Sequence, residues 1–414
     1  MANGGAPDVA LGRRVDAAPA GRTLNLVLAT WTFAITFWAW NLIGPLAARY
    51  TTELGLSATQ KSVLVATPVL VGAIGRIPVG ALTDRYGGRA LLSTLSFASI
   101  VPVLLVAVAG NAESYTLLLV FGFFLGIAGT SFAAGVPFVN AWFEPARRGF
   151  ATGVFGAGMG GTALSSFFTP RFVTWFGYTT AHVIVAVALA VTGVVLLVAM
   201  RDAPGWRPNT EAVMPKLTAA ARLPVTWHMS FLYAVTFGGF VAFSTYLPTY
   251  LADVYGFDLA GAGTRTAGFA LAAVVARPLG GALSDRVGPR AIVLVSLAGA
   301  AVSAVLMALK PDPELAAGTV FVLMALFLGL GAGGVFAWVA RRTPPERVGS
   351  VTGIVGAAGG LGGYFPPLVM GATYDEDTHS YTVGLMLLCV TAVGAFLFAA
   401  LRLRRDEHDA TARG

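Results

Sequence analysis

Charged residues are scarce in this sequence of 414 residues, of which only 11% are Asp, Glu, Lys or Arg. A soluble domain carries roughly 25% charged residues, so this chain cannot cover a water-facing surface. The scarcity excludes a cytosolic enzyme, a disordered protein and a nucleic-acid-binding protein. Cysteine is almost absent too: Cys389 stands alone, so no disulfide can form within the chain, and the sequence has no cluster of metal-ligating residues. We therefore expect neither a metal ion nor a cofactor.

Apolar residues dominate the chain instead: they make up 56% of it, and the mean hydropathy is +0.74. Runs of about 20 apolar residues recur, each long enough to cross ~30 Å of hydrocarbon as a helix. Twelve such runs cover residues 24–48, 59–82, 88–110, 114–140, 149–170, 178–200, 226–250, 261–283, 289–309, 317–340, 348–371 and 381–403. The sequence thus predicts an all-α polytopic membrane protein with twelve transmembrane helices.

The distribution of basic residues predicts the orientation in the membrane, because cytoplasmic loops accumulate Lys and Arg. Twenty of the 27 Lys and Arg lie in the two tails and in the loops after helices 2, 4, 6, 8 and 10, whereas five lie in the opposite loops. We expect a multi-pass protein of the cytoplasmic membrane, surrounded by the lipid bilayer, with both termini in the cytoplasm. Residues 1–22 are expected to form a disordered tail, and residues 404–414 a second tail.

The sequence contains an internal repeat. Residues 76–90, RIPVGALTDRYGGRA, align without gaps on residues 277–291, RPLGGALSDRVGPRA, with nine identities in fifteen positions. A second pair of segments, 149–157 and 349–357, recurs at nearly the same spacing. The repeat predicts two six-helix halves, residues 23–200 and 226–403, joined by a cytoplasmic linker over 201–225. Parallel repeats of this kind place a substrate site between the halves, near the middle of the membrane.

The two remaining basic residues, Arg76 and Arg277, occupy equivalent positions of this repeat inside apolar helices. Each precedes an aspartate at the helix end, Asp84 or Asp285, by eight residues, which is ~12 Å along a helix. A buried arginine needs an anionic or carbonyl partner. All twenty Asp and Glu lie in tails, loops or helix ends, and the four His also lie at ends or in loops. Two central cations without an internal counterion indicate an anion site; the alternative is that they only pack against backbone carbonyls or reach for the surface.

Two segments, GALTDRYGGR (80–89) and GALSDRVGPR (281–290), resemble the loop motif of the major facilitator superfamily. Within that superfamily the chain resembles the nitrate/nitrite porter family. This resemblance rests on the two arginines, on the segments 129–143 and 233–251, and on glycine-rich stretches at 153–161 and 353–363. It implies a carrier of nitrate and nitrite, working either by exchange or by proton-coupled uptake.

The resemblance also implies a set of site residues. Phe132, Tyr233 and Phe237 match positions that line the family's site, and the glycine-rich stretches contribute Gly156 and Gly356. Flat aromatic walls with a phenol donor suit a small planar anion. Helix packing is the alternative role for these aromatic residues, and for those of the first helix, namely Phe33, Phe37, Trp38 and Trp40. One position departs from the family, which commonly has an asparagine where this chain has Met159.

Charged residues follow helices 2 and 8 in both repeats, namely Asp84, Arg85, Arg89, Asp285, Arg286 and Arg290. In the superfamily such clusters lock the cytoplasmic side, so the resemblance implies a gating role. An acid at a helix C-terminus is also unfavourable without a cationic partner. Charges that only set the topology are the alternative for the arginines.

Together these features predict a monomeric secondary transporter that exchanges nitrate and nitrite by alternating access. Proton-coupled nitrate uptake and exchange of a small carboxylate such as oxalate or formate are the alternatives within transport. A membrane receptor that senses the anion is the alternative outside transport, although matched gate motifs argue against it. We expect no enzyme activity, because the membrane interior has no nucleophile, metal set or acid–base pair.

Overall fold

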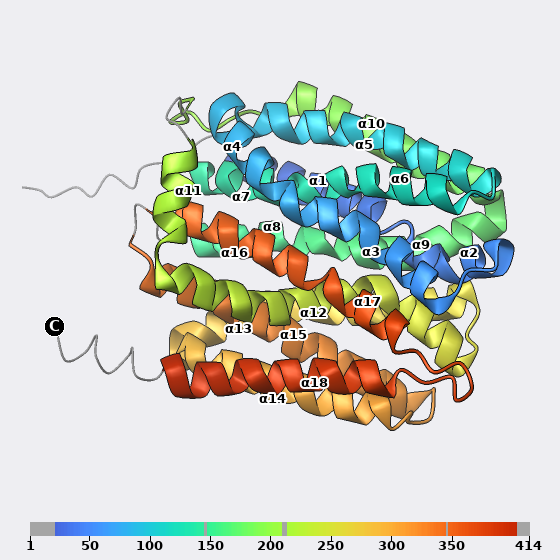
Figure 1. Cartoon of the computed structure of the whole chain (residues 1–414). Coiled ribbons are helices and arrows are strands. Elements are labelled where there is room, and N and C mark those ends of the chain that lie inside the picture. Colours follow the sequence, from blue (N-terminus) through green and yellow to red (C-terminus); the bar gives the residue numbers. More distant parts are fainter. Residues whose placement is uncertain (1–20, 145–146, 209–212, 345–346, 404–414) are drawn as a thin grey trace, which may run out of the picture.

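The computed structural model describes residues 21–144, 147–208, 213–344 and 347–403, and these ranges are almost entirely helical (Figure 1). Nearly all of both expected tails, 1–22 and 404–414, therefore lies outside the described residues. Within the described part of the chain, 11 helices are long and apolar enough to cross a membrane. The twelfth is the segmented helix 148–176, which occupies the expected position of the fifth span. The predicted twelve-helix architecture is confirmed.

Six spans form the N half. Several are interrupted, so the half contains more helical segments than spans. They are α1 (Arg22–Trp40), η1 (Gly44–Leu46), α2 (Ala47–Leu54), α3 (Ala58–Ile74), α4 (Arg76–Tyr86), α5 (Gly88–Asn111), α6 (Tyr115–Leu125), η2 (Gly126–Thr130), α7 (Ser131–Trp142), α8 (Arg148–Gly156), η4 (Ala157–Gly160), α9 (Gly161–Phe176) and α10 (Tyr178–Ala199).

Six further spans form the C half, and most of them are continuous helices. They are α12 (Pro224–Tyr255), α13 (Leu259–Val287), α14 (Pro289–Ala308), α15 (Leu315–Arg342), α16 (Val348–Gly362) with α17 (Phe365–Ala372), and α18 (Thr382–Leu397) with η6 (Phe398–Arg402). The expected linker, 201–225, is not simply a loop, because it contains the short helix α11 (Val213–Ala221).

The two halves lie side by side, with the N half in blue to green and the C half in yellow to red (Figure 1). They meet where α3 and α4 pack on α16, and where α8 and α9 pack on α13. We call the end of the bundle with α11 and the α4–α5 turn the basic end. The opposite end holds α2 and the loop between α17 and α18.

Glycines allow the close approaches that fix the helices around the centre. An added Cβ at Gly333 of α15 would lie 2.1 Å from the carbonyl oxygen of Arg277, and one at Gly329 would lie 2.4 Å from that of Ala273. Real Cβ atoms do not approach a carbonyl oxygen so closely, so only glycine lets α15 lie directly against the backbone of α13. This contact determines the position of Arg277.

The two halves differ in backbone structure at their equivalent arginines, Arg76 and Arg277. The second span is broken at Gly75, and Arg76 starts the new helix α4, whereas α13 runs unbroken past Arg277. A Cβ at Gly75 would lie 2.8 Å from both the Thr130 methyl carbon and the Val71 carbonyl oxygen. The equivalent residue in the C half is Ala276, so this sequence difference coincides with the difference in structure.

Candidate functional site

Arg76 and Arg277 lie in the interior of the bundle, at the boundary between the halves. Arg76 is 3% exposed and Arg277 is 9% exposed. Each is placed by its own half, Arg76 by the start of α4 and Arg277 by the middle of α13. The structure thus brings together the two residues that the repeat singled out.

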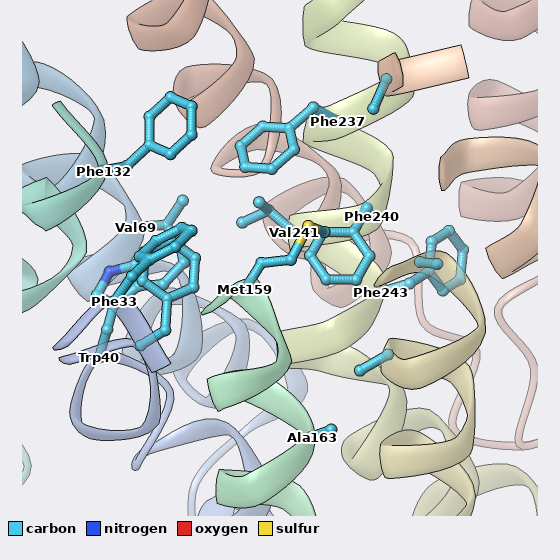
Figure 2. Packing of buried hydrophobic residues seen from close by; sticks show 14 of the residues in the cluster. Phe33, Trp40, Val69, Phe132, Met159, Ala163, Phe237, Phe240, Val241 and Phe243 are labelled. Atoms are coloured by element: carbon cyan, nitrogen blue, oxygen red, sulfur yellow. The ribbon is translucent and has the colours of Figure 1, made fainter. Parts of the chain in front are cut away.

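Both guanidinium groups share the same two aromatic rings. The Arg76 guanidinium carbon is 5.3 Å from the ring centre of Phe132 and 5.6 Å from that of Phe237. For Arg277 the corresponding distances are 5.7 and 5.3 Å. The rings come from opposite halves, Phe132 from α7 and Phe237 from α12, and they approach each other across the seam (Figure 2). All four contacts fall within the range of a cation–π interaction.

Each arginine also contacts the half to which it does not belong. Arg76 Nη1 donates a hydrogen bond of 2.8 Å to the carbonyl oxygen of Gly356 in α16. Arg277 Nη1 lies 3.3 Å from the sulfur of Met159 in η4. Met159 is the position at which the sequence departs from the family pattern, and its thioether is only a weak acceptor.

An aromatic wall stands beside Arg277. Tyr233 accepts a hydrogen bond of 2.9 Å from Arg277 Nη2, and its ring stacks on Phe237 at 4.9 Å between centres with an interplanar angle of 2°. Phe336 of α15 closes the wall, with its ring edge-on to Tyr233 at 4.7 Å and its centre 5.7 Å from the Arg277 guanidinium carbon. Sequence reasoning did not identify Phe336, because no motif or repeat marks it.

The two glycine-rich stretches lie close to the arginines and to the aromatic rings of the site. A Cβ added at Gly156 would lie 3.8 Å from Arg277 Nε, and one at Gly356 would lie 3.7 Å from the Phe132 ring. Two further glycines of α16 are tighter: the added Cβ would be 3.4 Å from Arg76 Nη1 at Gly360 and 2.2 Å from the Tyr233 ring at Gly359. Both stretches therefore bring backbone close to the arginines.

Arg76 retains hydrogen-bonding capacity. Within the described ranges, its Nε and Nη2 are buried and have no hydrogen-bond partner. No ion pair between described residues joins a carboxylate to either Arg76 or Arg277. The hydrogen bond to Gly356 is what we expect if Arg76 only packs against backbone carbonyls, but it leaves Nε and Nη2 without an acceptor. Buried donors without acceptors destabilise a site by ~1–3 kcal/mol each, so an anion bound here would be stabilised.

The aromatic residues of α1 differ in how close they lie to the site. Phe33 stacks on Phe155 at 4.8 Å and lies 5.6 Å from Phe132, whereas Trp40 donates a hydrogen bond to the carbonyl of Pro68. Trp38 donates to Thr169 of α9. None of the cation–π contacts of Arg76 or Arg277 within the described residues involves α1. Phe33 thus packs against a ring of the site, whereas Trp38 and Trp40 bond to other parts of the N half.

The expected gating residues all lie at the basic end. Asp84 lines a cavity there with Asp202 and Trp206 and interacts with Lys216 of the linker helix α11. Arg89 donates hydrogen bonds from its backbone to Asp202 and from its side chain to Leu197.

In the C half, Asp285 accepts from Arg341 at 3.4 Å, and Arg290 donates to the carbonyls of Ala399 and Ala400. Arg85 and Arg286 lie in the last turns of α4 and α13. The contacts of Asp285 and Arg290 stay within the C half, and those of Arg89 reach only the N half and the start of the linker. The gating role remains a prediction.

Twelve spans in two repeated halves, with a buried polar site at their seam, are the architecture of a secondary transporter. The sequence model of the Major Facilitator Superfamily matches residues 29–264 and 258–414. The chain is 63% identical to a Mycobacterium tuberculosis (strain ATCC 25618 / H37Rv) protein named "Probable nitrate/nitrite transporter NarK2", over 95% of this chain and 100% of that one. It is 35% identical to the "Probable nitrate/nitrite antiporter NarK1" of Thermus thermophilus, over 83% of each chain.

A solved structure shares the fold. The bacterial homolog to the human lysosomal transporter Spinster, in an inward-facing and occupied conformation, superposes with a TM-score of 0.70 at 18% identity. That alignment covers 92% of this chain and 97% of the other. The chain belongs to the Major Facilitator Superfamily and, within it, to the nitrate/nitrite porter family.

Proposed function

We propose that this chain is a secondary transporter that exchanges nitrate and nitrite across the cytoplasmic membrane. The observation that supports this most strongly is the pair of buried guanidinium groups, Arg76 and Arg277, held between the same two phenylalanine rings. The free N–H groups of Arg76 and the absence of any carboxylate partner among the described residues make an anion the missing component.

The geometry favours a small planar anion. Tyr233 and Phe237 stack in parallel beside Arg277, and the glycines of α16 let its backbone approach Tyr233 and Arg76. The edges of a planar anion can accept hydrogen bonds from guanidinium groups while its faces need only apolar contact. The names of the two relatives, a nitrate/nitrite transporter and a nitrate/nitrite antiporter, support the same substrates.

Charge repulsion favours exchange over net uptake. An empty site holds two buried like charges, whereas a site with one bound anion holds a smaller net charge. Closing the protein around the empty site therefore costs more free energy than closing it around the loaded one. Such a carrier changes sides readily only when an anion is bound, and each crossing then returns an anion in the opposite direction.

The proposal includes a monomer with both termini in the cytoplasm and no enzyme activity. The excess of basic residues at the basic end supports this orientation, because cytoplasmic loops accumulate Lys and Arg. The seam between the halves of one chain supplies both arginines and both rings, so a single copy is sufficient for the site.

Transport by the purified chain in proteoliposomes tests the proposal. Vesicles are loaded with nitrite or left without anion, and labelled nitrate is added with and without an inward proton gradient. We expect rapid uptake only into the nitrite-loaded vesicles, whatever the gradient. Uptake into empty vesicles that follows the gradient would identify proton-coupled nitrate transport instead.

Competition identifies the anion. Unlabelled nitrite should suppress the uptake of labelled nitrate, whereas oxalate and formate at the same concentration should not. Suppression by oxalate or formate, together with their own exchange, would assign the site to small carboxylates. Binding of nitrate without any movement across the membrane would assign the chain to anion sensing.

A further inference from the structure

A polar contact joins the two halves at the opposite end of the bundle, far from the motifs of the basic end. Lys61 of α3 forms an ion pair of 2.6 Å with Asp253 of α12. The side chain of Lys61 is 5% exposed and that of Asp253 is 17% exposed. A lysine that is buried without a counterion is strongly destabilised, so the closed arrangement of this end requires Asp253 beside Lys61.

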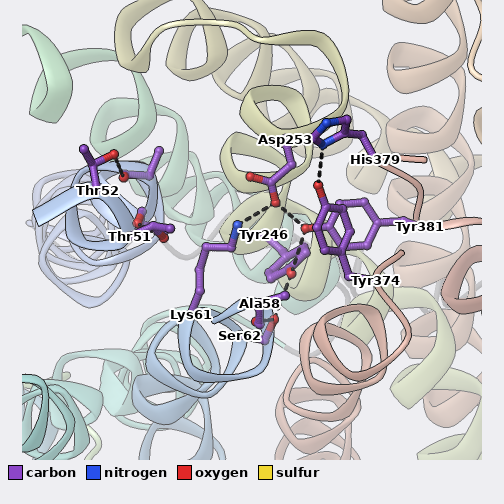
Figure 3. Close-up of polar contacts among 12 residues, drawn as sticks. Thr51, Thr52, Ala58, Lys61, Ser62, Tyr246, Asp253, Tyr374, His379 and Tyr381 are labelled. Carbon is purple, nitrogen blue, oxygen red and sulfur yellow. Dashed lines mark hydrogen bonds and ion pairs between the residues drawn. The ribbon is translucent and has the colours of Figure 1, made fainter. Parts of the chain in front are cut away.

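Three hydroxyl groups complete the contact, which we call the outer lock (Figure 3). Tyr381, in the loop before α18, donates to Asp253, and its oxygen lies 3.2 Å from that of Tyr246 in α12. The Tyr246 hydroxyl is in turn 2.8 Å from the hydroxyl of Ser62, the neighbour of Lys61. Burial raises the pKa of Tyr381 well above its ordinary value, and the nearby Tyr246 and Asp253 raise it further. This hydroxyl therefore keeps its proton and stays a donor.

The position of Lys61 in its helix gives the lock a second property. Lys61 is the fourth residue of α3, close to the helix N-terminus, where the macrodipole disfavours a cation and favours an anion. Asp253 supplies that anion from the other half. When the halves separate at this end, the first turn of α3 presents an ammonium group and a helix N-terminus without a negative partner.

Lys61 also lies on the route to the central site. It precedes Arg76 in the same span by fifteen residues, which is about 22 Å at the helical rise per residue. Lys61 pairs with Asp253 of α12 and Arg76 bonds to Gly356 of α16, so both cations lie at the seam between the halves. An anion that enters between the separated halves passes the ammonium group before it reaches the guanidinium groups.

We propose that Lys61 is an outer anion site with alternating partners, the Asp253 carboxylate when this end is closed and the transported anion when it is open. The inference rests on the proposed function for the identity of that anion. The exchange of one negative partner for another leaves the cation compensated in both states, which lowers the cost of breaking a buried ion pair.

A single cysteine reports the opening of this end. Thr249 is 1% exposed and lies one helical turn from Asp253, and its hydroxyl has no hydrogen-bond partner among the described residues. Thr245, one turn further in on the same face, approaches Gly44 of the N half through its carbonyl. We would introduce Thr249→Cys together with Cys389→Ser, purify the protein in detergent so that both ends are accessible, and measure the rate of maleimide labelling.

Removal of the lock should accelerate labelling. Asp253→Asn and Lys61→Gln should each raise the labelling rate about tenfold, which corresponds to a shift of ~1.4 kcal/mol towards the open state. The matched control is Glu314→Gln, which removes the ion pair of 3.3 Å between Glu314 and Arg265. That pair lies within the C half, so its loss should not change the labelling rate. Labelling at the rate of the unmodified reporter in both lock variants would overturn the lock.

Transport separates the anion site from the lock. In proteoliposomes, Lys61→Gln should require an outside nitrate concentration for half-saturation at least about threefold higher than Asp253→Asn requires, because only the first variant lacks the cation. Lys61→Arg, which keeps the charge, should resemble Asp253→Asn. Equal half-saturating concentrations in Lys61→Gln and Asp253→Asn would overturn the anion site.

Different results would contradict the outer lock and the proposed function. A chain that exchanges nitrate but shows no change in labelling contradicts the lock alone. A chain that carries no nitrate contradicts the proposed function, while labelling without anion still decides whether Lys61 and Asp253 hold this end closed. A charge-reversed double variant, Lys61→Asp with Asp253→Lys, distinguishes loss of the ion pair from misfolding of the single variants. It should restore slow labelling if the ion pair holds this end closed.

Discussion

The hydroxyl of Tyr233 accepts a hydrogen bond of 2.9 Å from Arg277, and both residues belong to the C half. Arg76, at the equivalent position of the repeat, bonds instead to the backbone of Gly356 in the other half and keeps two buried nitrogens without a partner among the described residues. The two arginines are therefore equivalent in sequence but not in the site. Tyr233 fixes the orientation of Arg277, whereas Arg76 is the freer donor.

Replacement of either arginine by lysine keeps the charge but removes the planar fork of N–H groups. We expect Arg76→Lys and Arg277→Lys each to lower nitrate exchange at least about tenfold, the effect of losing one or two charge-assisted hydrogen bonds. Expression and elution as a single species should be normal in both. Arg265→Lys, at a half-buried arginine in the second turn of α13 and outside the site, is the control. Near-normal exchange by either variant would remove that arginine from the site.

The hydroxyl of Tyr233 can be removed without loss of its ring. Tyr233→Phe should weaken nitrate binding about fivefold, which is ~1 kcal/mol for one hydrogen bond. Tyr255→Phe is the matched control, because Tyr255 donates a hydrogen bond of 2.9 Å to Pro311 outside the site. Phe237→Ala should weaken binding more, since this ring contacts both arginines and Tyr233. Affinities equal to that of the unmodified protein in Tyr233→Phe and Phe237→Ala would assign both rings to packing.

Two glycines of α16 differ in what an added methyl group would meet. At Gly359 the new Cβ would lie 2.2 Å from the Tyr233 ring, whereas at Gly353 nothing lies within 4 Å. We expect Gly359→Ala to displace Tyr233 and to reduce exchange at least as much as Tyr233→Phe does. Gly353→Ala should leave exchange unchanged. Similar exchange rates in the two alanine variants would mean that Tyr233 does not need its present position.

The glycines of the duplicated loop motif offer a stability test. Gly87 and Gly288 have φ angles of 88° and 89°, which residues with a Cβ rarely adopt. Gly288→Ala should cost ~1–3 kcal/mol through backbone strain alone. Gly87→Ala should cost more, because its Cβ would also lie 2.7 Å from the carboxylate of Asp202. Thermal unfolding in detergent should rank the variants in this order, and the reverse order would contradict the contact with Asp202.

Hydropathy predicts the spans well, because crossing a bilayer imposes a length that is visible in about 20 residues. The ends are less well predicted: α12 covers Pro224–Tyr255 where the sequence predicts 226–250. Those extra turns matter, because Asp253 lies in them. The sequence identifies Asp253 only as an acid at a helix end, and nothing local to it indicates that it pairs with Lys61, almost two hundred residues away.

The central site also combines residues that the sequence predicts with contacts that it does not predict. The repeat identifies Arg76 and Arg277 because buried charge at equivalent positions is visible in a single sequence. Phe336 and the contact between Arg277 and Met159 depend on how neighbouring helices are rotated and how closely they pack, which glycines such as Gly333 decide. A single sequence contains no direct record of that rotation.

The hydrogen bond from Arg76 to Gly356 spans 280 positions of the chain and therefore has a consequence for biogenesis. During synthesis the second span enters the membrane long before the eleventh span, which supplies the carbonyl. Arg76 must stay hydrated during that interval, because an unpartnered arginine in hydrocarbon costs at least several kcal/mol. The surroundings of Arg76 are therefore complete only after α16 has inserted, so the packing around this residue forms late in the assembly of the protein.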